Sequence, residues 1–181
     1  WKIIPKEILE TPKNGVLNVH HSLLPRWRGP SPVQAAILAG DAKTGVTIHL
    51  ATQKVDAGPI LAQKELKIEP EDTYLSLEEK LIALGIPLLI ETIPKWLRGE
   101  LTPQEQNESE AVYSHLVKTE DGHIDWSSPG EEILRKIRAL NPEPPFSPPG
   151  RQRPASLTSV KTWLPRSLPK FQSTPLNGGM D

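Results

Sequence analysis

Hydrophobic and polar positions alternate in short segments through the first half of the chain. Three segments have the period of two that is typical of β-strands, namely residues 16–20, 44–51 and 60–66. Farther on, Leu77, Leu81 and Leu84 recur at the spacing of one helix face, behind Thr73, which is a predicted N-cap. Strands interleaved with helices indicate an α/β fold.

Cap and turn residues mark the ends of the predicted helices. Ser31 and Pro32 are typical of a helix start, and Gly40 is typical of a helix end. The tripeptide Gly85–Pro87 predicts an interruption of the next helix, because proline lacks an amide hydrogen and its ring displaces the preceding turn. We therefore expect one helix before this tripeptide and a second that ends at Leu97.

Beyond these helices the pattern weakens. A polar linker is predicted at 99–127, with weak strand character in its second half, and a helix at 128–145 opens a second domain. Nine of the 20 prolines lie in residues 142–181, where neither a helical nor a strand period persists. Proline fixes φ and removes a donor, so we interpret 146–181 as an irregular, disordered tail. The α/β unit itself is assigned to 1–98.

Composition excludes several kinds of chemistry. The chain has no cysteine, so disulfides, thiolate catalysis and cysteine-bound zinc are ruled out. Its formal net charge of −1 gives no overall field that would gather nucleic acid, although residues 151–181 hold five Lys and Arg against one Asp. No apolar run approaches the roughly 20 residues that span a bilayer. We expect no membrane contact and a cytoplasmic location, with an organellar matrix as the alternative.

Two polar residues at a strand end and a carboxylate in a later loop form the candidate catalytic set. Asn18 and His20 are two positions apart on a predicted strand, so their side chains point to one face, whereas His21 points to the other. Asp56 follows the next strand, and active sites of open α/β sheets gather beyond strand ends. An amide, an imidazole and a carboxylate suit acyl transfer to an amine. The alternative is a capped strand end with a solvated carboxylate.

Residues 15–60 resemble the catalytic segment of the folate-dependent formyltransferases. That superfamily has an Asn-x-His strand end, a Ser-Leu-Leu-Pro loop and a downstream Asp-x-Gly. These motifs match 18–20, 22–25 and 56–58. The likeness covers about residues 1–145.

The likeness extends to the methionyl-tRNA branch of the superfamily, through Arg-Trp-Arg-Gly at 26–29 and Ile-Arg-Ala-Leu-Asn-Pro at 137–142. This resemblance implies transfer of a formyl group from 10-formyltetrahydrofolate to the amino group of methionine on initiator tRNA. It also implies that 1–98 is the C-terminal part of a Rossmann-like catalytic domain, and that no metal takes part.

The same resemblance implies roles for individual residues. Asn18 would bind the formyl oxygen as the tetrahedral intermediate forms. His20 would complete that stabilisation or pass a proton. Asp56 would hold His20 or a water and help to remove the amine proton. The folate site is predicted to include Ser22, Leu23, Leu24 and Pro25.

Several other polar residues have two interpretations. Arg26, Trp27 and Arg28 are predicted either to contact tRNA or to anchor their loop. Arg138 belongs either to a solvated helix face or to a tRNA-binding surface. His49 lies on a predicted strand and is interpreted as an ordinary packed or exposed residue.

Two alternative functions stay open at this point. A sugar-nucleotide formyltransferase would use the same fold with an amino-sugar acceptor, and a truncated chain would be a non-catalytic remnant. The only methionine is Met180, and the first five residues resemble the end of a buried strand. We therefore expect a monomeric fragment that lacks the start of its enzyme and is inactive alone.

Overall fold

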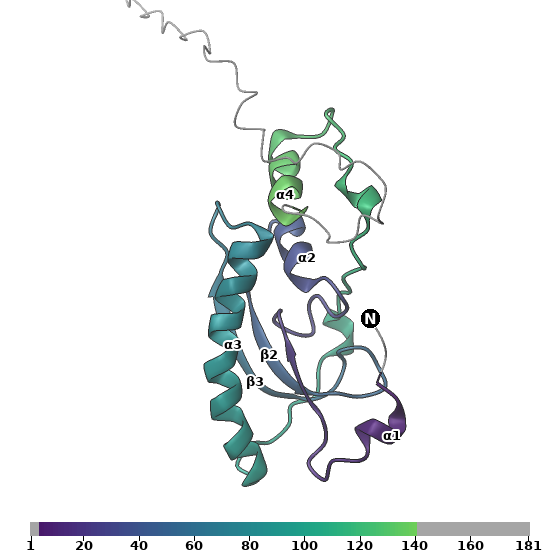
Figure 1. Ribbon diagram of the computed structural model, residues 1–181, viewed down its shortest axis with the longest axis vertical. Coiled ribbons are helices and arrows are strands. Elements are labelled where there is room, and N and C mark those ends of the chain that lie inside the picture. Colours follow the sequence, from purple (N-terminus) through teal and green to yellow (C-terminus); the bar gives the residue numbers. More distant parts are fainter. Residues whose placement is uncertain (1–3, 141–181) are drawn as a thin grey trace, which may run out of the picture.

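The structure, a computed structural model, describes residues 4–140 of the 181-residue chain. Helices lie beside and above a small sheet (Figure 1). The predicted tail at 146–181 lies outside the described residues. The elements in chain order are α1 (Lys6–Leu9), β1 (Leu17–His20), α2 (Pro32–Ala39), β2 (Lys43–Leu50), β3 (Ile60–Lys67), α3 (Tyr74–Leu97), the 3-10 helices η1 (Glu108–Glu110) and η2 (Thr119–Gly122), and α4 (Gly130–Leu140).

Three strands form one antiparallel sheet in the order β1-β2-β3. Each strand boundary agrees with the predicted alternation to within one residue. Asn18 of β1 lies opposite His49 of β2, so these two polar side chains are cross-strand neighbours. Val46 and Ile48 are fully buried and belong to the hydrophobic core. The predicted α/β class is confirmed.

Helix α3 covers the sheet as one continuous element of 24 residues. The prediction of two helices separated at Gly85–Pro87 is therefore wrong. Thr73 caps the helix as predicted, because its Oγ1 accepts the amide of Ser76 at 3.3 Å. Gly85 lies so close to the sheet that a Cβ there would be 3.3 Å from Val46 Cγ1. This packing offsets the roughly 3 kcal/mol that an internal proline costs a helix.

The segment from Ser22 to Arg28 covers polar groups of the sheet. Thr47 Oγ1 donates to Ser22 O at 2.6 Å and accepts the Leu24 amide at 3.2 Å. Gln63 of β3 donates from Nε2 to Leu24 O at 2.8 Å. Side chains of two strands therefore fix this segment, whose buried backbone groups need such partners.

Helices α2 and α4 pack together beside the N-terminal end of α3 (Figure 1). Val33 and Ile37 of α2 and Ala139 of α4 join Leu77 of α3 in the hydrophobic core. Helix α2 ends, as predicted, at Gly40, whose φ of 71° is left-handed and therefore suits glycine. The core thus extends beyond the sheet into a helical corner.

Helix α2 begins at Pro32 with Ser31 at its N-cap position, as predicted, but the Ser31 side chain makes no capping bond. Its Oγ accepts the Val117 amide at 3.3 Å, while its own amide donates to Ser114 Oγ at 3.1 Å. The predicted strand character of the linker is wrong. The second half of the linker is described and forms no strand; an isolated bridge joins Tyr113 to Arg28. Both differences have one cause. The linker backbone pairs with the loop before α2, and this pairing uses the groups that a cap or a strand would need.

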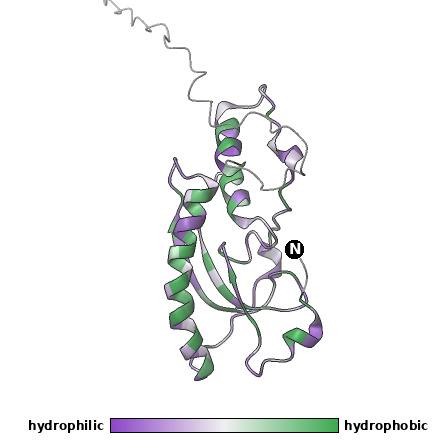
Figure 2. Ribbon diagram, viewed as in Figure 1, coloured by the Kyte–Doolittle hydropathy of each residue, from purple (hydrophilic) through white to green (hydrophobic). Residues whose placement is uncertain are grey.

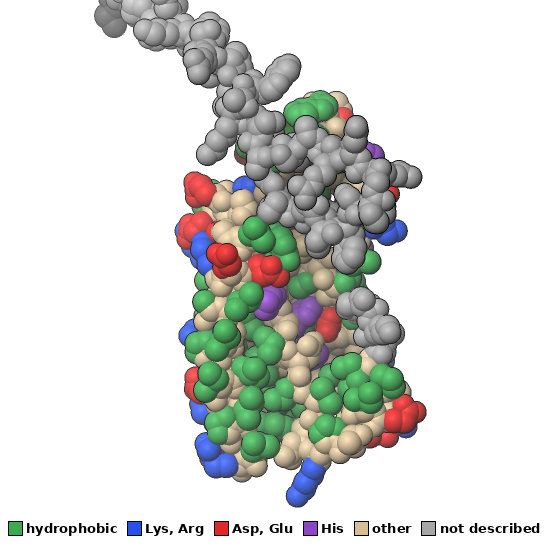
Figure 3. Space-filling view, viewed as in Figure 1, with side chains coloured by type: hydrophobic (Ala, Val, Ile, Leu, Met, Phe, Trp, Pro, Cys, Tyr) green, Lys and Arg blue, Asp and Glu red, His purple; other side chains and the backbone are tan. Residues whose placement is uncertain are grey.

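The outer side of α3 is also hydrophobic, as Figure 2 and Figure 3 show along the helix. Its large apolar side chains are between 38% and 67% exposed, and they are Leu75, Ile82, Ile86, Ile90, Ile93 and Leu97. Helix α3 is therefore apolar on two sides, which differs from the single stripe of an ordinary surface helix. Among the described residues, no helix is long and apolar enough to cross a membrane.

Candidate active site

The candidate catalytic residues converge beside β1. Asn18 Nδ2 donates to Asp56 Oδ1 at 3.2 Å, and His20 Nδ1 lies 3.7 Å from Asp56 Oδ2. The Gly29 amide donates to the same Oδ2 at 2.8 Å. Asn18, His20 and Asp56 all line one pocket of about 290 Å³. Histidine and acidic side chains meet at one spot on the surface in Figure 3. The predicted convergence is therefore confirmed.

Two residues at this site have backbone in the left-handed region that non-glycine residues seldom adopt. They are Trp27, with φ of 62°, and Asp56, with φ of 47°. The Trp27 carbonyl accepts a hydrogen bond from His20 Nε2 at 2.8 Å, and Gln106 donates to the Asp56 carbonyl at 2.9 Å. Such conformations cost about 1–3 kcal/mol and gather at functional sites. Here the loop that contains Trp27 places a carbonyl, and the loop that contains Asp56 a carboxylate, beside the imidazole of His20.

Burial and hydrogen bonding set the charges of the two titrating groups. Burial lowers the pKa of His20, and the Asp56 carboxylate offsets only part of that effect. Burial raises the pKa of Asp56, but the neighbouring histidines and the Gly29 amide outweigh it, so this pKa lies below its ordinary value. Because His20 Nε2 donates to a carbonyl, its lone pair is on Nδ1, which faces Asp56. A neutral base therefore lies beside an ionised carboxylate.

His49 is a member of the site that the sequence analysis missed. Its Nε2 lies 3.0 Å from Asn18 Nδ2 and 3.7 Å from Asp56 Oδ1, and the residue is only 1% exposed. Its ring meets that of His20 edge-on, with centroids 6.3 Å apart. The signal that would have found it is its cross-strand position opposite Asn18. That register depends on strand pairing and cannot be obtained from alternation within one strand.

His21 borders the same pocket. That its side chain points away from Asn18 stays a prediction. Tyr74 and Glu78 of α3 line the pocket as well. Burial lowers the pKa of His21, and Glu78 offsets this in part. Burial and Glu78 raise the pKa of Tyr74 to about 12.

The four residues predicted to bind folate do not line this pocket. Ser22 and Leu24 are 1% and 4% exposed, and Ser22 Oγ donates to Arg26 O at 2.6 Å. Leu23 packs on β2, where a Cβ on Gly45 would lie 2.6 Å from Leu23 Cδ2. Within the described residues they shape their loop, and their contact with folate stays a prediction.

Three of the four residues predicted to contact tRNA are at least partly exposed to solvent, namely Arg26, Trp27 and Arg138. Arg26 forms a two-point ion pair with Asp41, at 2.9 and 2.7 Å, and its guanidinium lies 4.4 Å above the Trp27 ring. Trp27 Nε1 donates to Asp41 Oδ2 at 2.7 Å. Arg138 Nη1 donates to the Asp72 carbonyl at 3.0 Å. These bonds favour anchoring, and contact with tRNA stays a prediction.

Arg28 is completely buried, which contradicts its interpretation as a tRNA contact. Its guanidinium donates to Gln106 at 3.0 Å, to Glu108 at 3.0 Å and to Tyr113 at 3.1 Å. A buried guanidinium needs such partners, since an unpaired buried charge is costly. Arg28 therefore anchors its loop to the linker.

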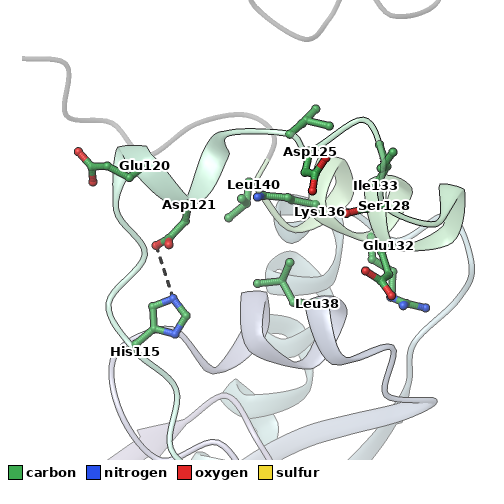
Figure 4. A pocket seen from close by; sticks show the side chains of 12 residues that line it. Leu38, His115, Glu120, Asp121, Asp125, Ser128, Glu132, Ile133, Lys136 and Leu140 are labelled. Atoms are coloured by element: carbon green, nitrogen blue, oxygen red, sulfur yellow. Dashed lines mark ion pairs between the residues drawn. The ribbon is translucent and has the colours of Figure 1, made fainter.

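A larger pocket of about 550 Å³ lies between α2, η2 and α4 (Figure 4). Leu38 and Ile133 contribute apolar surface, and charged side chains surround them. His115 Nε2 and Asp121 Oδ2 are 3.5 Å apart, and both side chains are exposed. Within residues 4–140, no group of histidine and carboxylate side chains could hold a metal ion. This pocket has no counterpart of the carboxylate of Asp56, which accepts hydrogen bonds from Asn18 and Gly29.

Two family models match the chain. The formyl transferase model covers residues 1–93, and the model of the formyl transferase C-terminal domain covers 116–158. The chain therefore belongs to the formyltransferase family, as its motifs predicted. Asn18, His20 and Asp56 all lie within the first match. The domain bounds inferred from the sequence stay predictions.

Curated relatives with high identity are methionyl-tRNA formyltransferases. The protein from Marinobacter nauticus is 45% identical over 152 residues, which are 83% of this chain and 49% of that protein. The protein from a Geobacillus species is 48% identical over 143 residues, which are 79% of this chain and 45% of that protein. The chain thus spans about half the length of these relatives.

Solved structures support the same fold. An N-formyltransferase from Helicobacter canadensis, in complex with folinic acid and dTDP-3-aminofucose, matches with a TM-score of 0.69 at 25% identity over 76% of this chain and 51% of that chain. HypX from Aquifex aeolicus, in complex with tetrahydrofolic acid, matches with a TM-score of 0.69 at 24% identity over 80% of this chain and 25% of that chain. The second match shows the fold alone.

Proposed function

We propose that this chain carries the acyl-transfer site of a methionyl-tRNA formyltransferase. The reaction moves a formyl group from 10-formyltetrahydrofolate to the amino group of methionine on initiator tRNA. The proposal rests on the convergence of Asn18, His20 and Asp56 in one pocket, where Asn18 donates a hydrogen bond to Asp56 and His20 Nδ1 lies 3.7 Å from the same carboxylate. The acceptor is inferred from the names of relatives at 45% and 48% identity.

Attack on the formyl carbon is the first step of this reaction. The free amine forms a new C–N bond directly, so no covalent enzyme intermediate is needed, and the formyl oxygen gains negative charge. Asn18 contributes an N–H donor that is already held in place by its neighbours. A preorganised donor stabilises an oxyanion more than a mobile one, since it does not have to reorient during the reaction.

Proton transfer completes the exchange. As the amine becomes an amide its nitrogen loses a proton, and His20 Nδ1 has the lone pair to accept it. Asp56, with Oδ2 at 3.7 Å, stabilises the imidazolium that results. The proton then passes to N10 of the folate as the old C–N bond breaks, which returns His20 to its neutral form.

The formyl donor and the partners follow from the proposed reaction. A folate-type donor is supported by the folinic acid named for the Helicobacter canadensis relative. Ser22 to Pro25, which lie in the loop after β1 and outside the pocket lining, remain the residues we propose for its binding. A tRNA acceptor requires a compartment in which translation takes place, so we propose the cytoplasm or an organellar matrix as its location. We also propose that the protein acts as a monomer.

The second candidate is an amino-sugar formyltransferase. It is favoured by the Helicobacter canadensis structure, which is a complex with dTDP-3-aminofucose. That relative is 25% identical to this chain, against 45% for the Marinobacter nauticus protein. We therefore rank the tRNA acceptor first.

A hybrid enzyme tests the proposal. The matching segment of this chain would replace its counterpart in the Marinobacter nauticus protein, and the intact 181-residue chain would be assayed beside it. Single-turnover formylation would be measured with methionyl-initiator tRNA and with a dTDP-linked 3-amino sugar, both with 10-formyltetrahydrofolate. We expect the hybrid to formylate the tRNA alone. Formylation of the amino sugar alone would overturn the proposed acceptor, and a hybrid that folds but formylates neither would overturn the proposed site.

A further inference from the structure

His49 and Asn18 form a buried cross-strand pair whose protonation can be assigned. His49 Nδ1 lies 3.0 Å from the Leu50 carbonyl. A carbonyl oxygen only accepts, so Nδ1 carries the proton and, in the neutral ring, Nε2 carries the lone pair. Asn18 Nδ2 lies 3.0 Å from that Nε2 and donates to it. The imidazole therefore acts as an acceptor for the amide of Asn18.

The amide of Asn18 fits this site in one orientation. Its nitrogen lies between two acceptors, His49 Nε2 at 3.0 Å and Asp56 Oδ1 at 3.2 Å. The reversed amide would place an oxygen against both acceptors, without a hydrogen between them. The terminal torsion of asparagine is broad in the absence of such partners. Two acceptors on different strands and loops therefore fix the plane of the amide.

The two N–H groups of Asn18 differ in their access to the pocket. His49 is 1% exposed and does not line the pocket, so the N–H that it accepts points into the protein. Asp56 is 15% exposed and lines the pocket, so the other N–H lies at the pocket wall. Only this second N–H is placed where a ligand oxygen can share it.

We propose that His49 is a positioning residue, which holds one N–H of Asn18 inside the protein and thereby directs the other to the pocket wall beside Asp56. The ligand oxygen that accepts this second N–H is the formyl oxygen, and that identification rests on the proposed function. The hydrogen bond from Asn18 to His49 does not depend on it. His49 itself does not touch the reacting atoms.

NMR of the isotope-labelled 181-residue chain tests the pair without any assay of formyl transfer. The nitrogen chemical shifts of His49 should report a proton on Nδ1 and a lone pair on Nε2 at neutral pH. A scalar coupling across the hydrogen bond should join Asn18 Nδ2 to His49 Nε2. A proton on Nε2 of the neutral ring, or the absence of the coupling in a spectrum with assigned signals, would overturn the proposal.

Two variants and one control separate positioning from packing. His49→Leu removes the acceptor and keeps an apolar volume, whereas His49→Gln offers an amide oxygen in its place. Loss of one hydrogen bond should speed solvent exchange of the Asn18 amide hydrogens by about 5- to 10-fold in His49→Leu. His49→Gln should restore most of the protection. His115→Leu changes a histidine whose side chain is 72% exposed, and it should leave these signals unchanged.

The hybrid enzyme gives an independent reading of the same proposal. Misplacement of the donor should lower kcat by about 100-fold in His49→Leu with little change in KM, and His49→Gln should recover part of that loss. A fall in folate affinity with unchanged kcat would contradict positioning. If the unmodified hybrid does not formylate, the proposed function fails, while the NMR result still decides the role of His49. If His49→Leu does not fold, the tautomer and coupling of the native chain decide it.

Discussion

One pocket of this molecule lies beside β1 and a second lies between α2, η2 and α4. The first has a volume of about 290 Å³ and the second about 550 Å³. In the first, the Asp56 carboxylate is 15% exposed and accepts from Asn18 and Gly29. In the second, His115 and Asp121 are paired but 72% and 37% exposed. Partly buried, bonded dipoles stabilise a developing charge, whereas exposed charges are screened. Hydrogen bonding between polar groups, more than volume, therefore distinguishes the candidate active site from the larger pocket.

The elements behind the two pockets explain the difference. Asn18 and His49 come from adjacent strands that also carry the core residues Val46 and Ile48. Helix α4, which lines the larger pocket, buries only Ala139. Side chains on well-packed strands have few alternative positions, and this rigidity is what a preorganised site requires.

Removal of the donor at the smaller pocket should have the largest consequence. Asn18→Ala in the hybrid enzyme should slow formyl transfer by about 100- to 1000-fold, because a donor aimed at the oxyanion is lost. Single-turnover kinetics with methionyl-initiator tRNA would measure it. Asp121→Ala, at the larger pocket, is the matched control and should leave the rate unchanged. Nearly full activity in Asn18→Ala would mean that its amide does not stabilise the oxyanion.

The free energy of unfolding should depend more on the buried Arg28 than on the exposed Arg26. Arg28→Met should destabilise the chain by about 2 kcal/mol, because the completely buried guanidinium of Arg28 donates hydrogen bonds to Gln106 and Tyr113, and both bonds are lost. Arg26→Met should cost about 1 kcal/mol or less, since its ion pair is 46% exposed on the arginine side. Urea unfolding of both variants gives the two values. Equal losses would contradict the anchoring role assigned to Arg28.

The charge of Asp56 should be visible in the titration of His20. A carboxylate at 3.7 Å favours the protonated imidazole, so it holds the pKa of His20 above the value that burial alone would set. Asp56→Asn removes this support, and the pKa of His20 should fall further. The acid limb of the hybrid's pH–rate profile should then move to lower pH. Proton NMR of the His20 ring across the pH range checks the sign, and an increase in its pKa would refute the account.

The smallest effect is expected at the ion pair of the larger pocket. His115→Ala removes an exposed partner of Asp121 and should change the free energy of unfolding by less than about 0.5 kcal/mol. It should also leave formyl transfer by the hybrid unchanged. Urea unfolding and single-turnover kinetics of this variant would be compared with those of His20→Ala. A loss of activity in both variants would show that the two pockets are coupled.

Much of the local structure was predictable because short-range patterns reflect backbone geometry. Alternation located the strand that ends at His20, and a glycine placed the end of α2 at residue 40. The same reasoning failed at Pro87, because helix α3 continues where a local rule predicts a break. Packing along the sheet outweighs that rule, and a pattern along the chain contains no measure of such packing.

At the site, the chemical groups could be identified from the sequence: Asn18 and His20 on one strand face, and Asp56 in a loop after the next strand. The family likeness assigned them their proposed roles in formyl transfer. That His49 joins them, that Arg28 is buried and that His21 borders the pocket became known from the folded structure alone. The physical reason is that strand register and loop packing bring together residues far apart in the chain, and a one-position shift in pairing would change every neighbour.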